Sequence, residues 1–102
     1  MEKQFLVNIH KAYRWVIAIC DKDLAGQKIE EGERQLDLTG NFFKGEEKTE
    51  EELKEIIQDC IREDSTFNII GEESCRIAEE LNLVEKEGVL RIRDIPYALV
   101  LL

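Results

Sequence analysis

Apolar and polar residues alternate near the start of the chain and then give way to an unbroken apolar run. Within residues 4–12 an apolar side chain occupies every second position, a period typical of a strand with one face in the core. Residues 15–20 are apolar throughout and rich in β-branched side chains, which indicates a strand buried on both faces and therefore central in a sheet. Residues 11–14 are predicted to form the hairpin turn between the two strands.

The next stretch carries a weaker pattern. Residues 28–38 are predicted to form one further strand, in which Gly32 marks a bulge or bend. Residues 40–45 hold Phe42 and Phe43 between two glycines and are predicted to form a loop that places an aromatic ring under the helices.

Two helices follow. Thr49 and Glu52 have the spacing of a capping box, and apolar residues recur at helical intervals after them, which predicts a first helix. A second helix is predicted from Asn68 to Leu81, with Asn68 as its cap, and Asn82 can adopt the left-handed conformation that ends a helix.

Two short strands are predicted to close the chain, over residues 89–95 and 97–102, with a turn near Pro96. The fold class is therefore α+β: a mixed or antiparallel sheet of about five strands with two helices packed on one face. Because the pattern contains no linker and no repeat, residues 1–102 are expected to form a single domain.

Charge changes this picture more than composition does. The 102 residues carry a net charge of −9, and residues 46–87 alone hold 15 acids and 5 bases. A uniform surface for polyphosphate is therefore excluded. No apolar segment is long enough to span a bilayer and no signal peptide is recognisable, so we expect a cytoplasmic protein without membrane contact. The three cysteines lie far apart inside apolar patterns, as reduced buried thiols do.

Three segments of the sequence, residues 18–33, 68–84 and 89–98, resemble the signature blocks of a small archaeal family catalogued as domain of unknown function number 424. The resemblance covers nearly the whole chain. It implies an uncharacterised protein with no established activity, for which a role in RNA binding or translation is suspected.

The family pattern implies a set of matching positions, which we carry forward as candidates. They are Cys20, Asp21, Leu24, Gly26, Glu31, Gly32, Asn68, Gly71, Pro96 and Ala98. Where the pattern often has a histidine after the proline and a glutamine after the alanine, this chain has Tyr97 and Leu99. Any role that requires those two side chains is therefore in doubt for this protein.

Cys20 and Asp21 close the predicted central strand and are the candidates for a small enzyme. A reactive thiol needs a nearby base or positive field, and His10 is the only histidine. Neighbouring acids would raise the thiol pKa, and a buried, unreactive Cys20 is the competing interpretation. The spacing of cysteines, histidine and acids fits neither a zinc nor a calcium site, so we expect no metal and no cofactor.

A second candidate surface combines basic and aromatic side chains, as sites for single-stranded RNA do. Its predicted contact residues are Lys11, Tyr13, Arg14, Arg91 and Arg93. The leading hypothesis is thus a non-enzymatic binding module that contacts RNA or a ribosome- or translation-associated protein. Two alternatives are an acidic protein–protein adaptor and an interaction protein that forms a homodimer through its last strand. In the competing interpretation, Trp15 belongs to the core and the charges solubilise turns.

Overall fold

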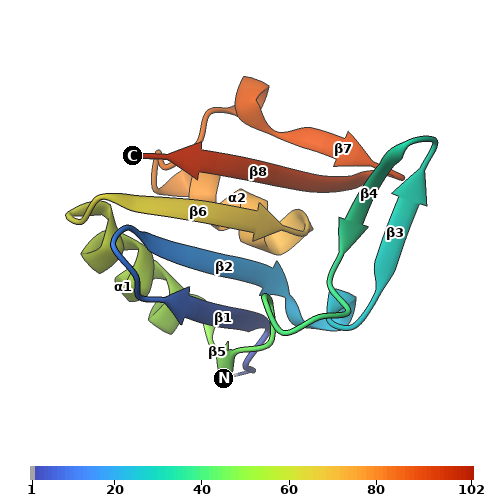
Figure 1. The fold of residues 1–102 in the computed structure, drawn as a ribbon. Coiled ribbons are helices and arrows are strands. Elements are labelled where there is room, and N and C mark those ends of the chain that lie inside the picture. The colour runs from blue at the N-terminus through green and yellow to red at the C-terminus, as the bar shows by residue number, and fades with distance from the viewer. Residues whose placement is uncertain (1) are drawn as a thin grey trace.

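The computed structural model describes residues 2–102 and is organised around one six-stranded sheet (Figure 1). Its strands are β1 (Phe5–His10), β2 (Trp15–Asp21), β5 (Glu46–Lys48), β6 (Ser65–Ile70), β7 (Leu90–Ile92) and β8 (Ile95–Leu101). They lie in the order β5-β1-β2-β6-β8-β7, with β2 and β6 parallel and every other pair antiparallel. The predicted α+β class is confirmed, with a larger sheet than expected.

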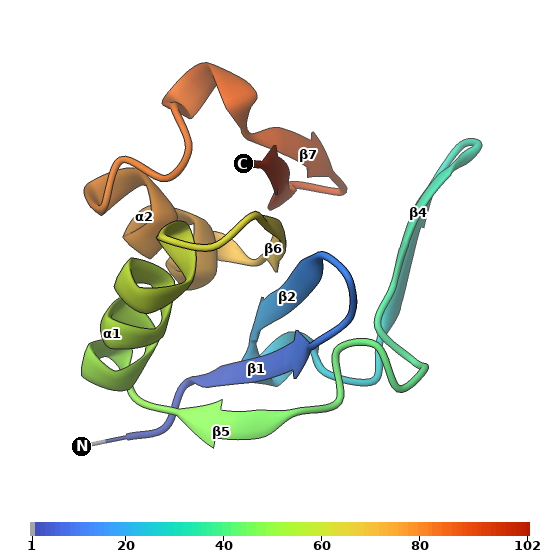
Figure 2. The ribbon, with the colours of Figure 1, turned by 60° about the vertical axis from the view of Figure 1, so that its left-hand side comes forward.

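Different elements cover the two faces of this sheet (Figure 2). The helices α1 (Glu50–Ile61) and α2 (Glu72–Glu80) lie on one face. A separate hairpin, made of β3 (Lys28–Glu31) and β4 (Arg34–Asp37), lies on the other. Short 3₁₀ segments, η1 (Lys22–Leu24) and η2 (Lys86–Gly88), follow β2 and precede β7. The sheet therefore separates two apolar layers, which we call the helix side and the hairpin side.

Strand β2 is central, as its apolar run predicts. It pairs with β1 on one side and β6 on the other. Ile17, Ala18, Ile19 and Cys20 are completely buried. Ile17 and Ile19 pack in the helix-side core, whereas Ala18 and Cys20 pack in the hairpin-side core. Because successive strand residues point to opposite faces, a strand between two cores must be apolar at every position.

The local signals for α1 and for the end of α2 are also confirmed. The Thr49 hydroxyl accepts from the Glu52 N–H at 3.2 Å, and the Thr49 N–H donates to the Glu52 carboxylate at 2.9 Å, which completes the capping box. Asn82 has a φ of 59°, and the Leu83 N–H folds back to the Ala78 carbonyl at 2.9 Å. This left-handed residue ends the helix and satisfies one of its last carbonyls.

The prediction of a helix from Asn68 to Leu81 is wrong in its first part. Residues Ser65–Ile70 form β6, and α2 begins only at Glu72. Asn68 therefore lies in a strand and caps nothing, while Gly71 occupies the N-cap position. The physical reason is that β6 is paired on both edges, with β2 and β8, which outweighs the weak helical periodicity of a β-branched segment.

Three smaller expectations also need correction. Residues 28–38 form a hairpin of two strands, and Gly32, with a φ of 65°, lies in its turn. Phe43 is buried as an aromatic anchor, but on the hairpin side and not under the helices. Residues 46–48, which precede the predicted first helix and were given no element of their own, form the edge strand β5. No helix within residues 2–102 is long and apolar enough to cross a membrane.

Candidate functional site

The five predicted contact residues do not form one surface. Lys11, Tyr13 and Arg14 lie in the turn between β1 and β2, where the Arg14 guanidinium donates to the Leu102 carbonyl at 2.9 Å. Arg91 lies on β7 and Arg93 in the turn before β8. Strand β8 runs from Ile95 to Leu101, so its whole length separates the two groups, which occupy opposite ends of the sheet (Figure 1). Tyr13 is fully exposed, whereas Trp15 is half-buried against the helix-side core.

Arg91 and Arg93 are engaged inside the molecule. The Arg91 guanidinium donates to the Glu72 carboxylate at 2.9 Å and to the Asp94 carbonyl at 2.8 Å. Arg93 donates through Nε to the Glu30 carbonyl at 2.6 Å, in the tip of the hairpin. Arg93 and Asp94 both have positive φ angles, 49° and 64°, which these contacts help to maintain. Both arginines therefore hold the β7–β8 turn in place.

Asp21 lies where β2 ends and α2 begins. Its carboxylate accepts hydrogen bonds from the Ser74 N–H at 2.8 Å, the Ser74 hydroxyl at 2.7 Å and the Glu73 N–H at 3.1 Å. These amides belong to the first turn of α2 and have no partner within the helix, so Asp21 caps α2 from the end of strand β2. Burial raises the pKa of Asp21, and the hydrogen bonds from Ser74 and Glu73 lower it in part.

Gly71 allows this approach. Its φ is 121°, in the region that favours glycine, and a Cβ at this position would collide with the Asp21 carboxylate. The Gly71 N–H donates to the Pro96 carbonyl at 2.9 Å. Three of the positions that match the family pattern, Asp21, Gly71 and Pro96, therefore meet in one junction that fixes α2 against the sheet.

Cys20 does not belong to this junction. It is fully buried on the hairpin side, whereas Asp21 faces the helix side. Burial, with Asp21 and Asp23 nearby, raises the pKa of the Cys20 thiol to about 12, so the thiol stays protonated. His10 pairs with Val16 at the other end of β2, and Cys20 pairs with Leu6, so the histidine cannot serve as its base. Thiol catalysis at Cys20 has no support in this geometry.

A cleft of about 770 Å³ opens beside Asp21. Its lining residues are Glu2, Lys3, Gln4, Asp21, Lys22, Asp23, Glu47 and Glu73. Five of these are acids and two are lysines, and the Asp21 carboxylate is already occupied with the helix. Among residues 2–102 no group of three or more His, Cys, Asp or Glu side chains is arranged to hold a metal ion.

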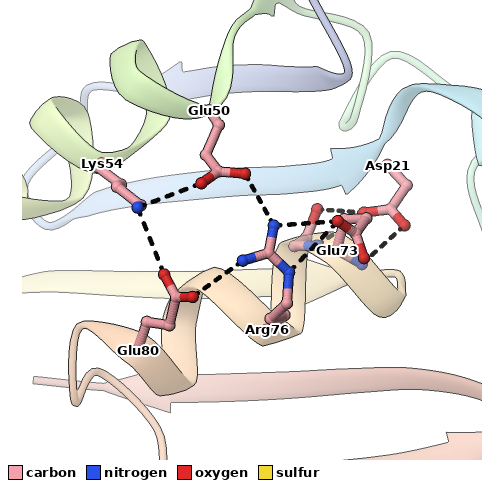
Figure 3. Close-up of polar contacts among 7 residues, drawn as sticks. Asp21, Glu50, Lys54, Glu73, Arg76 and Glu80 are labelled. Atoms are coloured by element: carbon pink, nitrogen blue, oxygen red, sulfur yellow. Dashed lines mark hydrogen bonds and ion pairs between the residues drawn. The ribbon is translucent and has the colours of Figure 1, made fainter.

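The acidic faces of the two helices are joined by their few cations (Figure 3). Arg76 of α2 contacts Glu50 of α1 at 2.8 Å, and within its own helix it contacts Glu73 and Glu80 at 3.0 Å each. Lys54 of α1 contacts Glu50 at 3.2 Å and Glu80 at 3.4 Å. The basic residues of the two helices, Lys54 and Arg76, are both paired with carboxylates in this network, so the net charge of the helix surface is negative.

The other positions from the family pattern lie mostly at the hairpin. Gly26, with a φ of 80°, donates to the Leu38 carbonyl at its base, and Gly32 forms its turn. The Glu31 carboxylate accepts from the Arg93 N–H at 3.3 Å. Leu24 packs against the hairpin-side core, and Ala98 is buried in β8. Arg34, which the sequence did not single out, also holds the hairpin, and no local pattern identifies it in advance.

The part of the hairpin side that the hairpin leaves uncovered is the best candidate for a binding surface. Registers across β2, β6 and β8 place Val16, Thr66, Asn68, Leu99 and Leu101 on this face, which we call the open sheet face. Leu99 is 60 % and Leu101 70 % exposed, whereas Phe67 and Ile69, on the opposite face of β6, are fully buried. In Figure 1 this half of the sheet faces the viewer with no element across it.

Two polar features give the open sheet face chemical character. Asn68 is half-buried near its centre, and its amide makes no side-chain hydrogen bond within residues 2–102. At its margin, the His10 ring stacks on Phe42 at 4.8 Å, and His10 Nε2 lies 3.0 Å from the Phe42 carbonyl. An uncharged surface with exposed leucines, the Thr66 hydroxyl and the Asn68 amide can bind an apolar partner that also offers hydrogen-bonding groups.

Comparisons with known proteins agree with the fold and assign no activity. Residues 9–102 match a family model described as "Protein of unknown function (DUF424)". The structure is similar to the crystal structure of an uncharacterized conserved protein from Methanopyrus kandleri, with a TM-score of 0.82 and 22 % identity over 95 % of this chain and 91 % of that chain. At this identity the likeness shows the fold alone. No curated protein matches the chain.

Proposed function

This chain belongs to DUF424, a family of proteins of unknown function, and we propose that it is a cytoplasmic, non-enzymatic module that binds a basic protein on its open sheet face. The observation that carries the proposal is the exposure of Leu99 and Leu101 on the same face of β8, in the part of the strand that extends beyond its pairing with β7. Large apolar side chains gathered on a pleated surface mark interaction sites more often than isolated exposed ones do.

Charge supports a basic partner. Residues 95–102 contain no charged side chain, while the whole chain carries −9. An apolar contact at an uncharged strand, on a molecule whose negative charge lies mainly in residues 46–87, suits a protein of opposite charge that is attracted by the net charge and held by the leucines. Two copies of this chain would repel each other, so a homodimer through β8 is the weaker form of the same proposal.

RNA is the second candidate partner. It rests on the fully exposed Tyr13, which lies with Lys11 and Arg14 in the turn at one end of the open sheet face. Stacking and phosphate contacts would both be available there. However, Arg91 and Arg93 lie at the opposite end, and the strand positions of the face carry no aromatic side chain. We therefore rank RNA below a protein partner.

The test compares three proteins as immobilised baits in extract from native cells. They are the wild type, the double variant Leu99→Lys/Leu101→Lys, and the control Ile61→Lys, which alters an exposed isoleucine at the end of α1, on the helix side. A basic protein retained by the wild type and the control but lost by the double variant is the expected result. Its affinity is then measured with the purified pair.

The double variant distinguishes a basic protein, RNA and a homodimer, because its two lysines add positive charge as well as removing apolar side chains. RNA, titrated as a labelled single strand at about 50 mM and 200 mM salt, would bind the double variant more tightly than the wild type. A homodimer would appear as a wild-type sedimentation coefficient that falls in the double variant alone. If all three baits retain the same proteins, the open sheet face is not the binding surface.

A further inference from the structure

The β3–β4 hairpin is attached to the rest of the molecule differently from every other element. It forms its own two-stranded sheet and shares no backbone ladder with the six-stranded sheet. Figure 2 shows it standing apart from the helices, on the far side of the sheet, and joined to the rest of the chain at one end. Each hydrogen bond that holds its tip therefore involves at least one side chain.

These tip contacts are few and lie in the solvent. Arg34 donates to the Arg91 carbonyl and to the Tyr97 hydroxyl, both at 3.0 Å. Arg93 donates to the Glu30 carbonyl at 2.6 Å and, through its N–H, to the Glu31 carboxylate at 3.3 Å. Exposed polar contacts of this kind contribute little to stability, because water competes for both partners.

The apolar attachment is also narrow. Between Gly26 and Gly40 only three residues are buried: Ile29 and Leu36 in the strands, at 9 % and 8 % exposure, and Leu38 at the base, at 3 %. Two glycines flank the hairpin, Gly26 and Gly40, and neither has another atom within 4 Å of the position a Cβ would take. A segment with few buried contacts and unobstructed glycines at both ends has the features of a hinged element of low local stability.

The surface beneath the hairpin continues the open sheet face. Cys20, Ile70 and Tyr97 form the cross-strand row next to the row of Ala18, Asn68 and Leu99 on the same side of the sheet. Cys20 and Ile70 are buried there. Opening of the hairpin would therefore join this apolar row to the exposed leucines.

We propose that the β3–β4 hairpin is a flap that opens from its tip while the helix side stays folded, and that its opening enlarges the face that binds the partner. The second half of this proposal rests on the proposed function; the first half does not. The flap regulates the extent of apolar surface offered to the partner.

The three cysteines allow opening to be measured without any added label. Cys20 lies under the hairpin, whereas Cys60 and Cys75 are buried in the helix-side core. The full chain is treated with an alkylating reagent at neutral pH, and modification of each cysteine is followed by peptide mass spectrometry. The flap predicts that Cys20 reacts at least about tenfold faster than Cys60 and Cys75, at a rate that low concentrations of urea barely change.

The variant Arg34→Ala/Arg93→Ala removes the three tip contacts that the arginine side chains make and leaves the one from the Arg93 backbone N–H. Arg62→Ala, which alters an exposed arginine at the end of α1, is the control. We expect faster labelling of Cys20 in the first variant, with Cys60 and Cys75 unchanged, and no effect in the control. Equal rates for all three cysteines in the wild type would show that Cys20 is reached only by global unfolding, and this would overturn the flap.

Nile red, a neutral dye that fluoresces on apolar surface, tests the enlargement of the face. Its emission should rise with Arg34→Ala/Arg93→Ala and fall when Leu99→Lys/Leu101→Lys is added. Selective labelling of Cys20 without this change in emission would show that the flap opens but does not enlarge the open sheet face. This result would overturn the second half of the proposal. Because the labelling experiment needs no partner, its outcome is independent of whether the proposed basic protein is found.

Discussion

At the residue scale, Asp21 combines a cost and a gain. The residue is 9 % exposed and burial opposes its charge, yet its carboxylate accepts hydrogen bonds from two backbone amides and one hydroxyl at the start of α2. Removing an acceptor from buried donors costs more than the net value of the hydrogen bonds, because the donors remain without water. The carboxylate therefore stabilises the junction although its own pKa is raised.

Replacement of the Asp21 side chain measures the net contribution of its hydrogen bonds to stability. We expect Asp21→Ala to lower the free energy of unfolding by about 2 kcal/mol, since it leaves the Glu73 and Ser74 amides without an acceptor. Urea denaturation followed by circular dichroism measures the difference. A variant as stable as the wild type would mean that water reaches these amides.

The pH dependence of the same site has a definite sign. Because the pKa of Asp21 is raised above its ordinary value of 3.8, the folded protein binds more protons than the unfolded chain between that value and the folded pKa. The contribution of Asp21 to the free energy of unfolding is therefore largest below pH 3.8 and declines as the pH rises through this window. The free energy of unfolding of the wild type should fall relative to that of Asp21→Asn from acid to neutral pH in a denaturation series, and a relative rise would contradict the assignment.

Gly71 and Gly26 form a matched pair of positive-φ glycines. At Gly26 a Cβ would meet nothing within 4 Å, whereas at Gly71 it would meet the Asp21 carboxylate. Gly26→Ala should therefore cost about 1–2 kcal/mol through the backbone alone. Gly71→Ala should cost at least about 3 kcal/mol, because the backbone strain is joined by a collision inside the junction. Equal losses in thermal or urea unfolding would show that α2 moves to make room.

The residue scale is also where sequence reasoning reaches its limit. Asp21 was a candidate for a small enzyme beside Cys20, because nothing in the linear pattern shows that its carboxylate accepts hydrogen bonds from amides 52 and 53 residues later. Asn68 was assigned as a helix cap on its residue type, but type alone does not distinguish a cap from a polar position in a strand. Its free amide on the open sheet face follows only from the registers of β6 with β2 and β8.

At the element scale, Arg76 links the two helices through Glu50, Glu73 and Glu80. These carboxylates are exposed, so water screens much of the attraction. We expect Arg76→Gln to lower the free energy of unfolding by about 1 kcal/mol at low salt, and by less at high salt. Arg62→Gln removes the same charge at the end of α1 and is the control. Equal effects of the two substitutions would show that Arg76 acts through the net charge and that its ion pairs add no stability of their own.

Elements with a strong local signal were predictable, and elements defined by their neighbours were not. The capping box of α1 and the left-handed end of α2 depend on residues close in sequence, so the pattern located them. Strand β6 instead exists because β2 and β8 flank it, and β3 and β4 separate only at the turn containing Gly32. Neither pairing is visible in a single segment.

At the scale of the whole molecule, the expected layering of two helices on one face of a sheet is confirmed, and the coverage of the other face is new. The main sheet has six strands where about five were expected, because β5 and β6 were not predicted as strands and the predicted strand over residues 28–38 forms a separate hairpin. The five candidate contacts were grouped on chemistry alone, and the topology then distributed them between the two ends of β8. The sequence pointed to the open sheet face only through the alternative of a homodimer formed by the last strand.

The balance between net charge and ion pairs predicts how salt acts on the whole fold. The molecule measures 36 × 28 × 28 Å, so at about 10 mM salt, where the screening length is about 30 Å, every charge of the −9 excess repels the others. At about 150 mM salt the screening length is about 8 Å, which suppresses this repulsion. The nine ion pairs of residues 2–102 have separations of 2.8–3.4 Å and are affected far less.

Raising the salt between these two concentrations should therefore stabilise the protein. We expect the unfolding temperature to rise by a few degrees, as measured by circular dichroism at neutral pH. Arg62→Gln, which brings the net charge to −10 without touching the network, should gain more than the wild type from the same salt. A fall in the unfolding temperature would show that the ion pairs outweigh the repulsion, and that the acidic surface is internally balanced instead of left free to attract a basic partner.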